Sequence, residues 1–427
     1  MKRAKAGLFG GKWLIWAVWM VLGTIGALGA GGALGLLGTF GVPGAWGIAA
    51  AQGASNQGGS AQAVPATTFD INAGAAILVD AASGQVLYEK NADEPLPPAS
   101  MAKLMTMLLV MEEIDAGRLQ LDEKVTTSAR AAGIGGSQVY LRQGEVFTVE
   151  DLMKAVTIHS ANDAAVALAE HVAGSVEAFV DAMNARAKEL GMTKTYYANP
   201  DGLPSDPGQP PTLTTARDLT IIAREVIKYE EILAWASLVQ ADFRTQPRTI
   251  LYNTNKLIGR YAGMDGLKTG HTEEAGYCLT ATAKRGDIRL ISVVMKTASE
   301  EERQIQTTRL LDYGFRNFTR QVLAPAGEEV GKLKVKNGWP GAVPVVAAAD
   351  LAPLVRRGTA EDITTELRLL TVKAPVEKGA AVGTLVARSA QGDLTEVPVV
   401  TAEAVKRANF FIIFLRWLKG LIVGLFT

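Results

Sequence analysis

The apolar positions of residues 69–320 change their spacing twice along the chain. Short β-rich runs come first, a middle part has apolar residues three to four positions apart, and β-rich runs return at the end. The predicted strands are residues 75–79, residues 85–88 and two runs between residues 279 and 295. The predicted helices are residues 101–113, 152–172 and 176–190. This order predicts a mixed α/β domain, residues 69–320, in which the early hairpin and the late strands form one antiparallel sheet flanked by helices.

A second, smaller domain follows over residues 321–405. Alanine, proline, valine and glycine dominate this stretch, and its apolar runs are short. The predicted strands are residues 332–336, 342–347, 363–370 and 397–400. We therefore predict a small all-β domain here.

The last segment, residues 406–427, predicts an amphipathic helix. At about 100° per residue Arg416 and Lys419 share one narrow sector, while phenylalanine, isoleucine, leucine and tryptophan cover most of the remaining circumference. This distribution is typical of a helix that lies in the membrane interface. The alternative is a core helix of the β domain, in which both cations would need buried partners.

Residues 1–51 predict export from the cytoplasm. Four basic residues precede a stretch, residues 13–69, that contains no charged side chain, and Ala49-Ala50-Ala51 has the small residues of a signal cleavage site. The apolar stretch exceeds the ~7–15 residues of a signal peptide core, so a cleaved signal and a retained membrane anchor both stay open. Residues 52–68 have the Gly, Ser, Ala and Gln composition of a flexible linker.

Composition removes several functional classes. Lysine plus arginine and aspartate plus glutamate both number 43, so the excess positive charge of a nucleic-acid-binding protein is missing. The single cysteine, Cys278, excludes an intrachain disulfide and a thiolate metal cluster, and three histidines argue against a dedicated zinc site. We expect no metal and no cofactor.

Three short motifs carry the candidate chemistry. They are Ser100-Met101-Ala102-Lys103, Ser160-Ala161-Asn162 and Lys268-Thr269-Gly270. Each is weak evidence alone, and Ser100 by itself could be a helix N-cap. Together they favour nucleophilic catalysis, because Ser100 and Lys103 share one face of a helix start, and a lysine whose pKa is lowered by burial can take the proton of a serine hydroxyl.

The three motifs resemble those of the serine penicillin-recognising family, and within it those of the D-alanyl-D-alanine carboxypeptidases, the low-molecular-mass penicillin-binding proteins. The resemblance covers residues 69–318 closely, and the β-rich region and the tail match in position and character. Other matching segments are Asn162-Asp163-Ala164-Ala165, Met183-Asn184, Leu190-Gly191-Met192 and residues 265–272. The resemblance implies a β-lactamase-like catalytic domain that trims the terminal D-Ala from peptidoglycan stem pentapeptides and is acylated by β-lactams.

The resemblance also implies catalytic roles. Ser100 would be the nucleophile that forms the acyl-enzyme, and Lys103 would be its base. Ser160 would relay a proton to the leaving amine, and Asn162 would hold the substrate amide and orient Lys103. The backbone N–H groups of Ser100 and His271 would form the oxyanion hole.

Five further residues would contact the substrate in this comparison. Lys268 and Thr269 would hold the terminal carboxylate, and Gly270 would let the substrate backbone approach the strand. The His271 ring would lie close to the substrate. Arg303 stands where the family often has an arginine that steers the carboxylate, a looser match than the three motifs.

Other functions stay open beside the carboxypeptidase. A D,D-endopeptidase of the same family would cut cross-links with the same residues, and a catalytically inactive peptidoglycan-binding protein would have no reason to keep all three motifs. A class A β-lactamase is disfavoured because no Glu-x-x-x-Asn element follows Ser160, and a Ser-His-Asp hydrolase because no G-x-S-x-G elbow occurs. We expect action at the outer face of the cytoplasmic membrane or in the cell wall.

Overall fold

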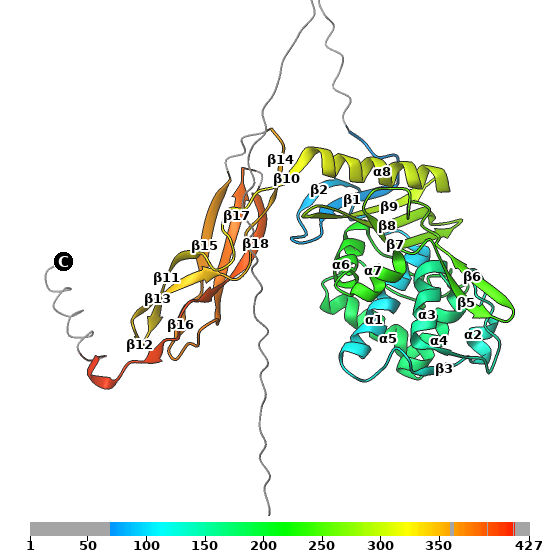
Figure 1. The fold of residues 1–427 in the computed structure, drawn as a ribbon, viewed down its shortest axis with the longest axis horizontal. Helices are drawn as coiled ribbons and strands as arrows, with labels where there is room; N and C mark the ends of the chain where they lie inside the picture. Colours follow the sequence, from blue (N-terminus) through cyan, green and yellow to red (C-terminus); the bar gives the residue numbers. More distant parts are fainter. Residues whose placement is uncertain (1–68, 359–362, 391, 413, 415–427) are drawn as a thin grey trace, which may run out of the picture. The chain divides into compact units, whose positions relative to one another are not determined.

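The computed structural model describes residues 69–358, 363–390, 392–412 and 414 (Figure 1). The predicted export segment 1–51 and linker 52–68 lie outside these residues, as does most of the predicted C-terminal helix. Within the described part, no helix is both long enough and apolar enough to cross a membrane.

A five-stranded sheet organises the catalytic domain. Its strands are β1 (Ala75–Asp80), β2 (Val86–Lys90), β7 (Met264–Thr272), β8 (Gly276–Arg285) and β9 (Ile288–Thr297). The strand order is β2-β1-β9-β8-β7, and every neighbouring pair is antiparallel. The early hairpin and the late strands therefore share one sheet, as predicted. Strand β7, which carries the third motif, is an edge strand.

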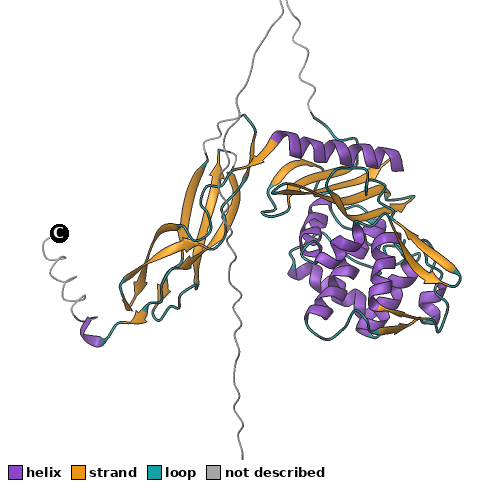
Figure 2. Ribbon diagram, viewed as in Figure 1, coloured by secondary structure: helices purple, strands orange, loops and turns teal. Residues whose placement is uncertain are grey.

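Helices cover both faces of this sheet (Figure 2). Alternate residues of β1 enter two separate cores: Ile77 and Val79 pack with the helical cluster, whereas Ala76 and Leu78 pack towards α8 (Glu300–Asn317). The helical cluster consists of α1 (Lys103–Asp115), α2 (Ala129–Gly133), α3 (Val149–Lys154), α4 (Asn162–Ala173), α5 (Val176–Glu189), α6 (Ala216–Val226) and α7 (Glu230–Ala236). Two small hairpins accompany it: β3 (Lys124–Thr126) with β4 (Val146–Thr148), and β5 (Gln240–Thr245) with β6 (Arg248–Tyr252).

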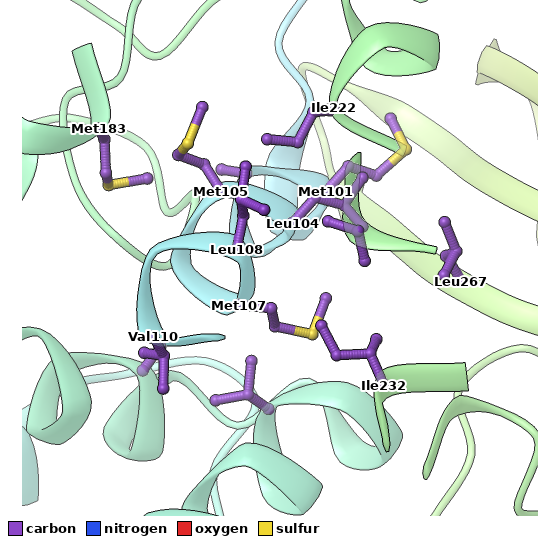
Figure 3. Packing of buried hydrophobic residues seen from close by; sticks show 14 of the residues in the cluster. Met101, Leu104, Met105, Met107, Leu108, Val110, Met183, Ile222, Ile232 and Leu267 are labelled. Atoms are coloured by element: carbon purple, nitrogen blue, oxygen red, sulfur yellow. The ribbon is translucent and has the colours of Figure 1, made fainter. Parts of the chain in front are cut away.

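Helix α1 lies at the centre of the larger core. Side chains from other helices and from β7 surround its methionines and leucines, as Figure 3 shows. The labelled neighbours of α1 include Met183 of α5, Ile222 of α6 and Leu267 of β7. Because α1 is buried on nearly all sides, the residues at its start are held by packing rather than by a cap, and the Ser100 side chain makes no capping hydrogen bond.

The helix predicted over residues 152–172 is interrupted. Helix α3 ends in a π-helical turn, Ala155–His159, and α4 begins at Asn162. Between them Ser160 has a positive φ of 66°, a left-handed conformation that non-glycine residues adopt rarely. The hydrophobic spacing is continuous across this break, so it predicted a single helix and could not show the change in backbone conformation. Such π-turns and strained residues are concentrated at functional sites.

The β domain is built on a six-stranded sheet. Its strand order is β15-β17-β18-β13-β11-β16. The strands are β11 (Glu329–Lys336), β13 (Ala342–Ala347), β15 (Thr364–Leu369), β16 (Val372–Lys373), β17 (Ala381–Ser389) and β18 (Gly392–Thr401). A short pair, β12 (Gly338–Trp339) with β19 (Lys406–Arg407), precedes the C-terminal segment. The all-β character is as predicted, although β17 was not among the predicted strands.

Strands β10 (Phe318–Arg320) and β14 (Leu354–Arg356) pair with each other and contact the first hairpin of the catalytic sheet. The guanidinium of Arg320 lies 2.8 Å from a carboxylate oxygen of the fully buried Asp80. Gln85 exchanges two hydrogen bonds, of 2.8 and 3.0 Å, with the backbone of Leu354. An ion pair and two hydrogen bonds therefore join the β10–β14 pair to the β1–β2 hairpin.

Candidate active site

Ser100 lies in a tight turn, and two glycines from other segments pack closely against the backbone of this turn. The turn is a 3₁₀ helix, Ala99–Ala102, that leads directly into α1. A side chain at Gly270 of β7 would collide with the carbonyl oxygen of Pro98, and one at Gly202 would collide with that of Ala99. Gly202 also has a φ of +79°, which favours glycine. Two distant segments thus press against the turn that presents the Ser100 hydroxyl.

Lys103 is fully buried one turn after Ser100. Its ammonium donates hydrogen bonds to the Ser100 hydroxyl at 2.9 Å, to Asn162 Oδ1 at 2.6 Å and to the Asp201 carbonyl at 2.6 Å. Burial lowers the pKa of Lys103 to about 8, although the carboxylates of Asp201 and Asp163 act in the opposite direction. A lysine with this pKa is partly neutral near neutral pH, so it can accept the Ser100 proton.

Asn162 and Asp163 connect the second motif to the neighbouring loop. Asn162 Nδ2 donates to the carbonyl of Gly135 at 2.7 Å, so its Oδ1 faces Lys103. The buried Asp163 carboxylate accepts from the backbone N–H groups of Val139 and Leu141, at 3.1 and 2.9 Å. Hydrogen bonds therefore hold the loop of residues 135–141 against the second motif.

Ser160 and Lys268 form a second hydroxyl–ammonium pair. Both side chains are buried, and Lys268 Nζ lies 2.8 Å from Ser160 Oγ and 3.1 Å from the Thr269 carbonyl. Burial, together with the positive charges of Lys103 and Arg303, lowers the pKa of Lys268 well below its usual value. The site therefore contains two buried lysines, each in contact with one serine hydroxyl.

A cleft of about 280 Å³ opens onto these hydroxyls. Its lining includes six of the predicted site residues: Ser100, Ser160, Thr269, Gly270, His271 and Arg303. Lys103, Asn162 and Lys268 do not line it. Lys103 and Lys268 lie behind the hydroxyls of Ser100 and Ser160, and Asn162 contacts Lys103. The structure thus brings all nine predicted residues together and divides them into a surface layer and a buried layer.

The far side of the cleft is suited to an anion. Arg303, in the first turn of α8, is largely buried but lines the cleft; its Nη2 lies 3.0 Å from Glu300. Its Nε–H is buried and has no acceptor among the residues that the structure describes. Thr269 Oγ1 donates to Thr254 Oγ1 at 2.7 Å. The His271 ring stacks on Tyr277, with ring centroids 4.0 Å apart. A guanidinium and a hydroxyl that line the same cleft form an arrangement that binds carboxylates.

The sequence did not single out several residues of the cleft and its support. Ser137, Thr254, Lys256, Tyr277 and Glu300 also line the cleft, and Asp163 and Asp201 influence Lys103 from behind it. Only Asp163 had a local signal, because it directly follows Asn162. Glu300 lies three residues before Arg303 on α8, whose helix was not predicted. The remaining residues reach the site from other segments, so no motif in the sequence grouped them with the three motifs.

Comparison with known proteins identifies the family. The family model described as D-alanyl-D-alanine carboxypeptidase matches residues 60–299. The chain is similar to D-alanyl-D-alanine carboxypeptidase DacF of Bacillus subtilis, with 41% identity over 349 residues, which is 81% of this chain and 88% of the relative. The chain belongs to the D-alanyl-D-alanine carboxypeptidase family. The resemblance inferred from the three motifs is thereby confirmed, as is the activity expected from it.

Other comparisons extend this carboxypeptidase likeness to both domains. The family model described as the C-terminal domain of penicillin-binding protein 5 matches residues 318–407. The crystal structure of penicillin-binding protein 5 from Haemophilus influenzae is similar with a TM-score of 0.70 and 31% identity, covering 80% of this chain and 99% of that one. The predicted fold class is therefore confirmed for both domains.

Two further relatives bear on specificity and inhibition. A D-alanyl-D-alanine endopeptidase from Pseudomonas aeruginosa is 33% identical over 229 residues, 52% of this chain and 71% of the relative. Penicillin-binding protein D2 from Listeria monocytogenes, solved in its ampicillin-bound form, has a TM-score of 0.53 and 36% identity, and covers 58% of this carboxypeptidase chain and 98% of its own.

Proposed function

We propose that this carboxypeptidase cleaves the terminal D-Ala from peptidoglycan stem pentapeptides with Ser100 as nucleophile and Lys103 as base. The observation that carries the proposal is the 2.9 Å contact between the Ser100 hydroxyl and a buried lysine whose pKa is about 8. In the neutral form of Lys103, the hydroxyl can donate its proton to Nζ.

Acylation would begin when Ser100 Oγ attacks the carbonyl of the penultimate D-Ala and its proton passes to Lys103. The negative charge on the substrate oxygen would be held by the backbone N–H groups of Ser100 and His271. The departing D-Ala amine needs one proton, and Ser160 would relay to it the proton that Lys103 took up; the 2.8 Å contact between Lys268 Nζ and Ser160 Oγ supports this role. Ser100 is then left as an ester of the shortened stem peptide.

Deacylation would reverse these roles with water in place of the amine. Lys103 would take a proton from the water, whose oxygen attacks the ester carbonyl, and Ser100 would recover its own proton as the ester bond breaks. A β-lactam would enter the same sequence through its ring carbonyl. Slow hydrolysis of the resulting ester would leave the enzyme blocked.

The terminal carboxylate would be held at the far side of the cleft. Arg303 contributes the positive charge of its guanidinium there, and Thr269 contributes a hydroxyl. Lys268 would act from the buried layer, through Ser160 and its own field, because it does not line the cleft. Charge-assisted hydrogen bonds of ~1.5–3 kcal/mol each would favour substrates with a free C-terminus.

A D,D-endopeptidase activity is the second candidate, supported by the likeness to the Pseudomonas aeruginosa endopeptidase. One experiment tests both: incubation of the protein with a labelled penicillin and mass spectrometry of the labelled peptide, followed by assays on a pentapeptide ending in D-Ala-D-Ala and on a cross-linked dimer. Label on Ser100 with D-Ala release supports the carboxypeptidase. Cleavage of the dimer alone would favour the endopeptidase, and label elsewhere would reject the nucleophile assignment.

We also propose that the enzyme is exported and lies at the outer face of the cytoplasmic membrane, held there by residues 406–427. Peptidoglycan is assembled outside that membrane, which places the substrate there. Among the described residues, Asn409 caps a helix start by accepting from the N–H of Ile412 at 3.0 Å. Phe410 and Phe411 on this first turn are 82% and 66% exposed, as a membrane-facing helix requires.

A further inference from the structure

One end of the β domain carries a cluster of exposed cations around a tryptophan. Strands β11 and β16 place Lys336 beside Lys373, and strands β12 and β19 place Trp339 opposite Lys406, which is followed by Arg407. All four cations are exposed, and Trp339 is 58% exposed. We call these five residues the basic rim.

Among the residues that the structure describes, the cations of the basic rim have no carboxylate partner. No salt bridge joins Lys336, Lys373, Lys406 or Arg407 to an acidic group in the part of the chain that the structure describes. The exposed carboxylates nearest in sequence, Glu377 and Glu403, form no ion pair with them.

At the opposite edge of the same sheet, the cations are paired with carboxylates. On β15 and β17, Arg368 and Arg388 each bind both Glu366 and Asp393, at distances from 2.6 to 3.2 Å. Within its described residues, the β domain therefore pairs Arg368 and Arg388 with carboxylates at one edge of the sheet and has no such pairs for the cations of the basic rim at the other. Exposed unpaired cations in a group repel one another, which costs stability unless an external anion compensates them.

The basic rim lies where the C-terminal segment begins. Arg407 is two residues before Asn409, which caps the helix start, and the Ala408 N–H donates to the carbonyl of Asn337 between Lys336 and Trp339. Figure 1 shows β12 and β16 at the end of the β domain from which this segment leaves. A membrane that receives Phe410 and Phe411 would therefore meet the basic rim as well.

We propose that the basic rim is a second membrane contact, in which the β domain itself binds the headgroups of anionic phospholipids. This inference rests on the proposed membrane association of residues 406–427 and adds the identity of the lipid. Tryptophan is favoured at the level of the headgroups, and basic residues beside it are attracted to negatively charged lipid. The charge of the rim selects the lipid, while the aromatic helix start supplies apolar contact that does not depend on lipid charge.

The test measures partition of the full chain onto vesicles of phosphatidylcholine, with and without phosphatidylglycerol. The variant carries Lys336→Gln, Lys373→Gln, Lys406→Gln and Arg407→Gln. The matched control neutralises three lysines and one arginine that are exposed on the catalytic domain: Lys124→Gln, Lys188→Gln, Lys284→Gln and Arg260→Gln. Neither set includes a residue of the cleft, so both variants should release D-Ala at the parent rate.

The rim variant should lose binding to the anionic vesicles by on the order of 10²–10³-fold at low salt, since each basic residue at an anionic surface contributes about fivefold. Its binding to phosphatidylcholine alone should not change, and the control should behave like the parent. Raising the salt concentration should remove most of the parent's preference for anionic vesicles, because headgroup attraction is screened.

Four results would overturn the proposal. Parent-like binding of the rim variant to anionic vesicles would remove the rim from the membrane, and an equal loss in the control would assign the effect to net charge. Loss of binding to soluble polyphosphate with vesicle binding intact would assign the rim to a soluble polyanion. If the parent binds neither kind of vesicle, the membrane association of residues 406–427 fails too, whereas failure of the rim alone leaves phosphatidylcholine binding intact.

Discussion

Replacing Asp201 with asparagine should shift the pH dependence of Ser100 acylation towards lower pH. Asp201 lies behind the site, with its backbone carbonyl on Lys103 Nζ and its carboxyl buried. The carboxylate raises the pKa of Lys103 against the larger effect of burial. Asparagine keeps the shape and an oxygen that can accept from the Leu203 N–H, as Asp201 Oδ1 does at 2.8 Å, but removes the charge.

The expected profile of the parent enzyme follows from the Lys103 pKa of about 8. At pH 7 about 10% of the lysine is then neutral, against ~0.03% for a lysine at the ordinary value of 10.5, so burial increases the reactive fraction about 300-fold. The acylation rate constant should rise roughly tenfold between pH 7 and pH 9, with its midpoint near the pKa of about 8. Asp201→Asn should lower this midpoint and therefore raise the neutral fraction at pH 7.

The assay is stopped-flow acylation by a chromogenic β-lactam across this pH range, with thermal unfolding of each variant as a check on the fold. Asp206→Asn is the matched control, because Asp206 lies on the same segment but is exposed and makes no contact with Lys103. Its midpoint should equal that of the parent. A midpoint that is unchanged or higher in Asp201→Asn would refute the electrostatic reasoning and with it the assignment of the pH dependence to Lys103.

Three other changes test separate parts of the structure. Ser100→Ala should abolish both covalent penicillin labelling and D-Ala release, and stoichiometric labelling of this variant by mass spectrometry would reject the nucleophile. Arg303→Gln should raise KM for a pentapeptide with a free C-terminus and leave the already weaker amidated peptide unaffected; equal losses on both would contradict a carboxylate contact. Arg320→Met should lower the free energy of unfolding by about 3–5 kcal/mol in urea titrations, because Asp80 would remain buried and unpaired. Arg316→Met, which removes a 78% exposed partner of Asp312, should cost less than ~1 kcal/mol, and similar costs for the two would refute the role of burial.

The sequence predicted which residues form the site, but not which of them line the cleft and which are buried behind it. Ser100, Lys103, Ser160 and Lys268 stood out because each motif is short and local. The burial of Lys268 behind Ser160 was not predicted, because it depends on how an edge strand packs against the break before α4, more than one hundred residues earlier in the chain.

The prediction of helices was limited in the same way, because the hydrophobic pattern does not record backbone conformation or long-range packing. The amphipathic period over residues 152–172 predicted helix but not the break at Ser160, since the break comes from a strained backbone and not from a change in hydrophobicity. Helix α8 was not predicted: its acidic first turn and several charged residues along its length obscure the apolar face that packs on the sheet. The role of Arg303 therefore follows from the family resemblance and not from the hydrophobic pattern of its helix.

The crowding of Gly202 and Gly270 against the Ser100 turn has a practical consequence. Three segments far apart in sequence must all arrive before the serine is presented correctly, so an unfolded or partly folded chain carries the same hydroxyl without its reactivity. Covalent penicillin labelling would then count native molecules rather than total protein. Used during refolding, or on chains recovered from cells, it would give a chemical measure of correct assembly that needs neither substrate turnover nor a purified sample.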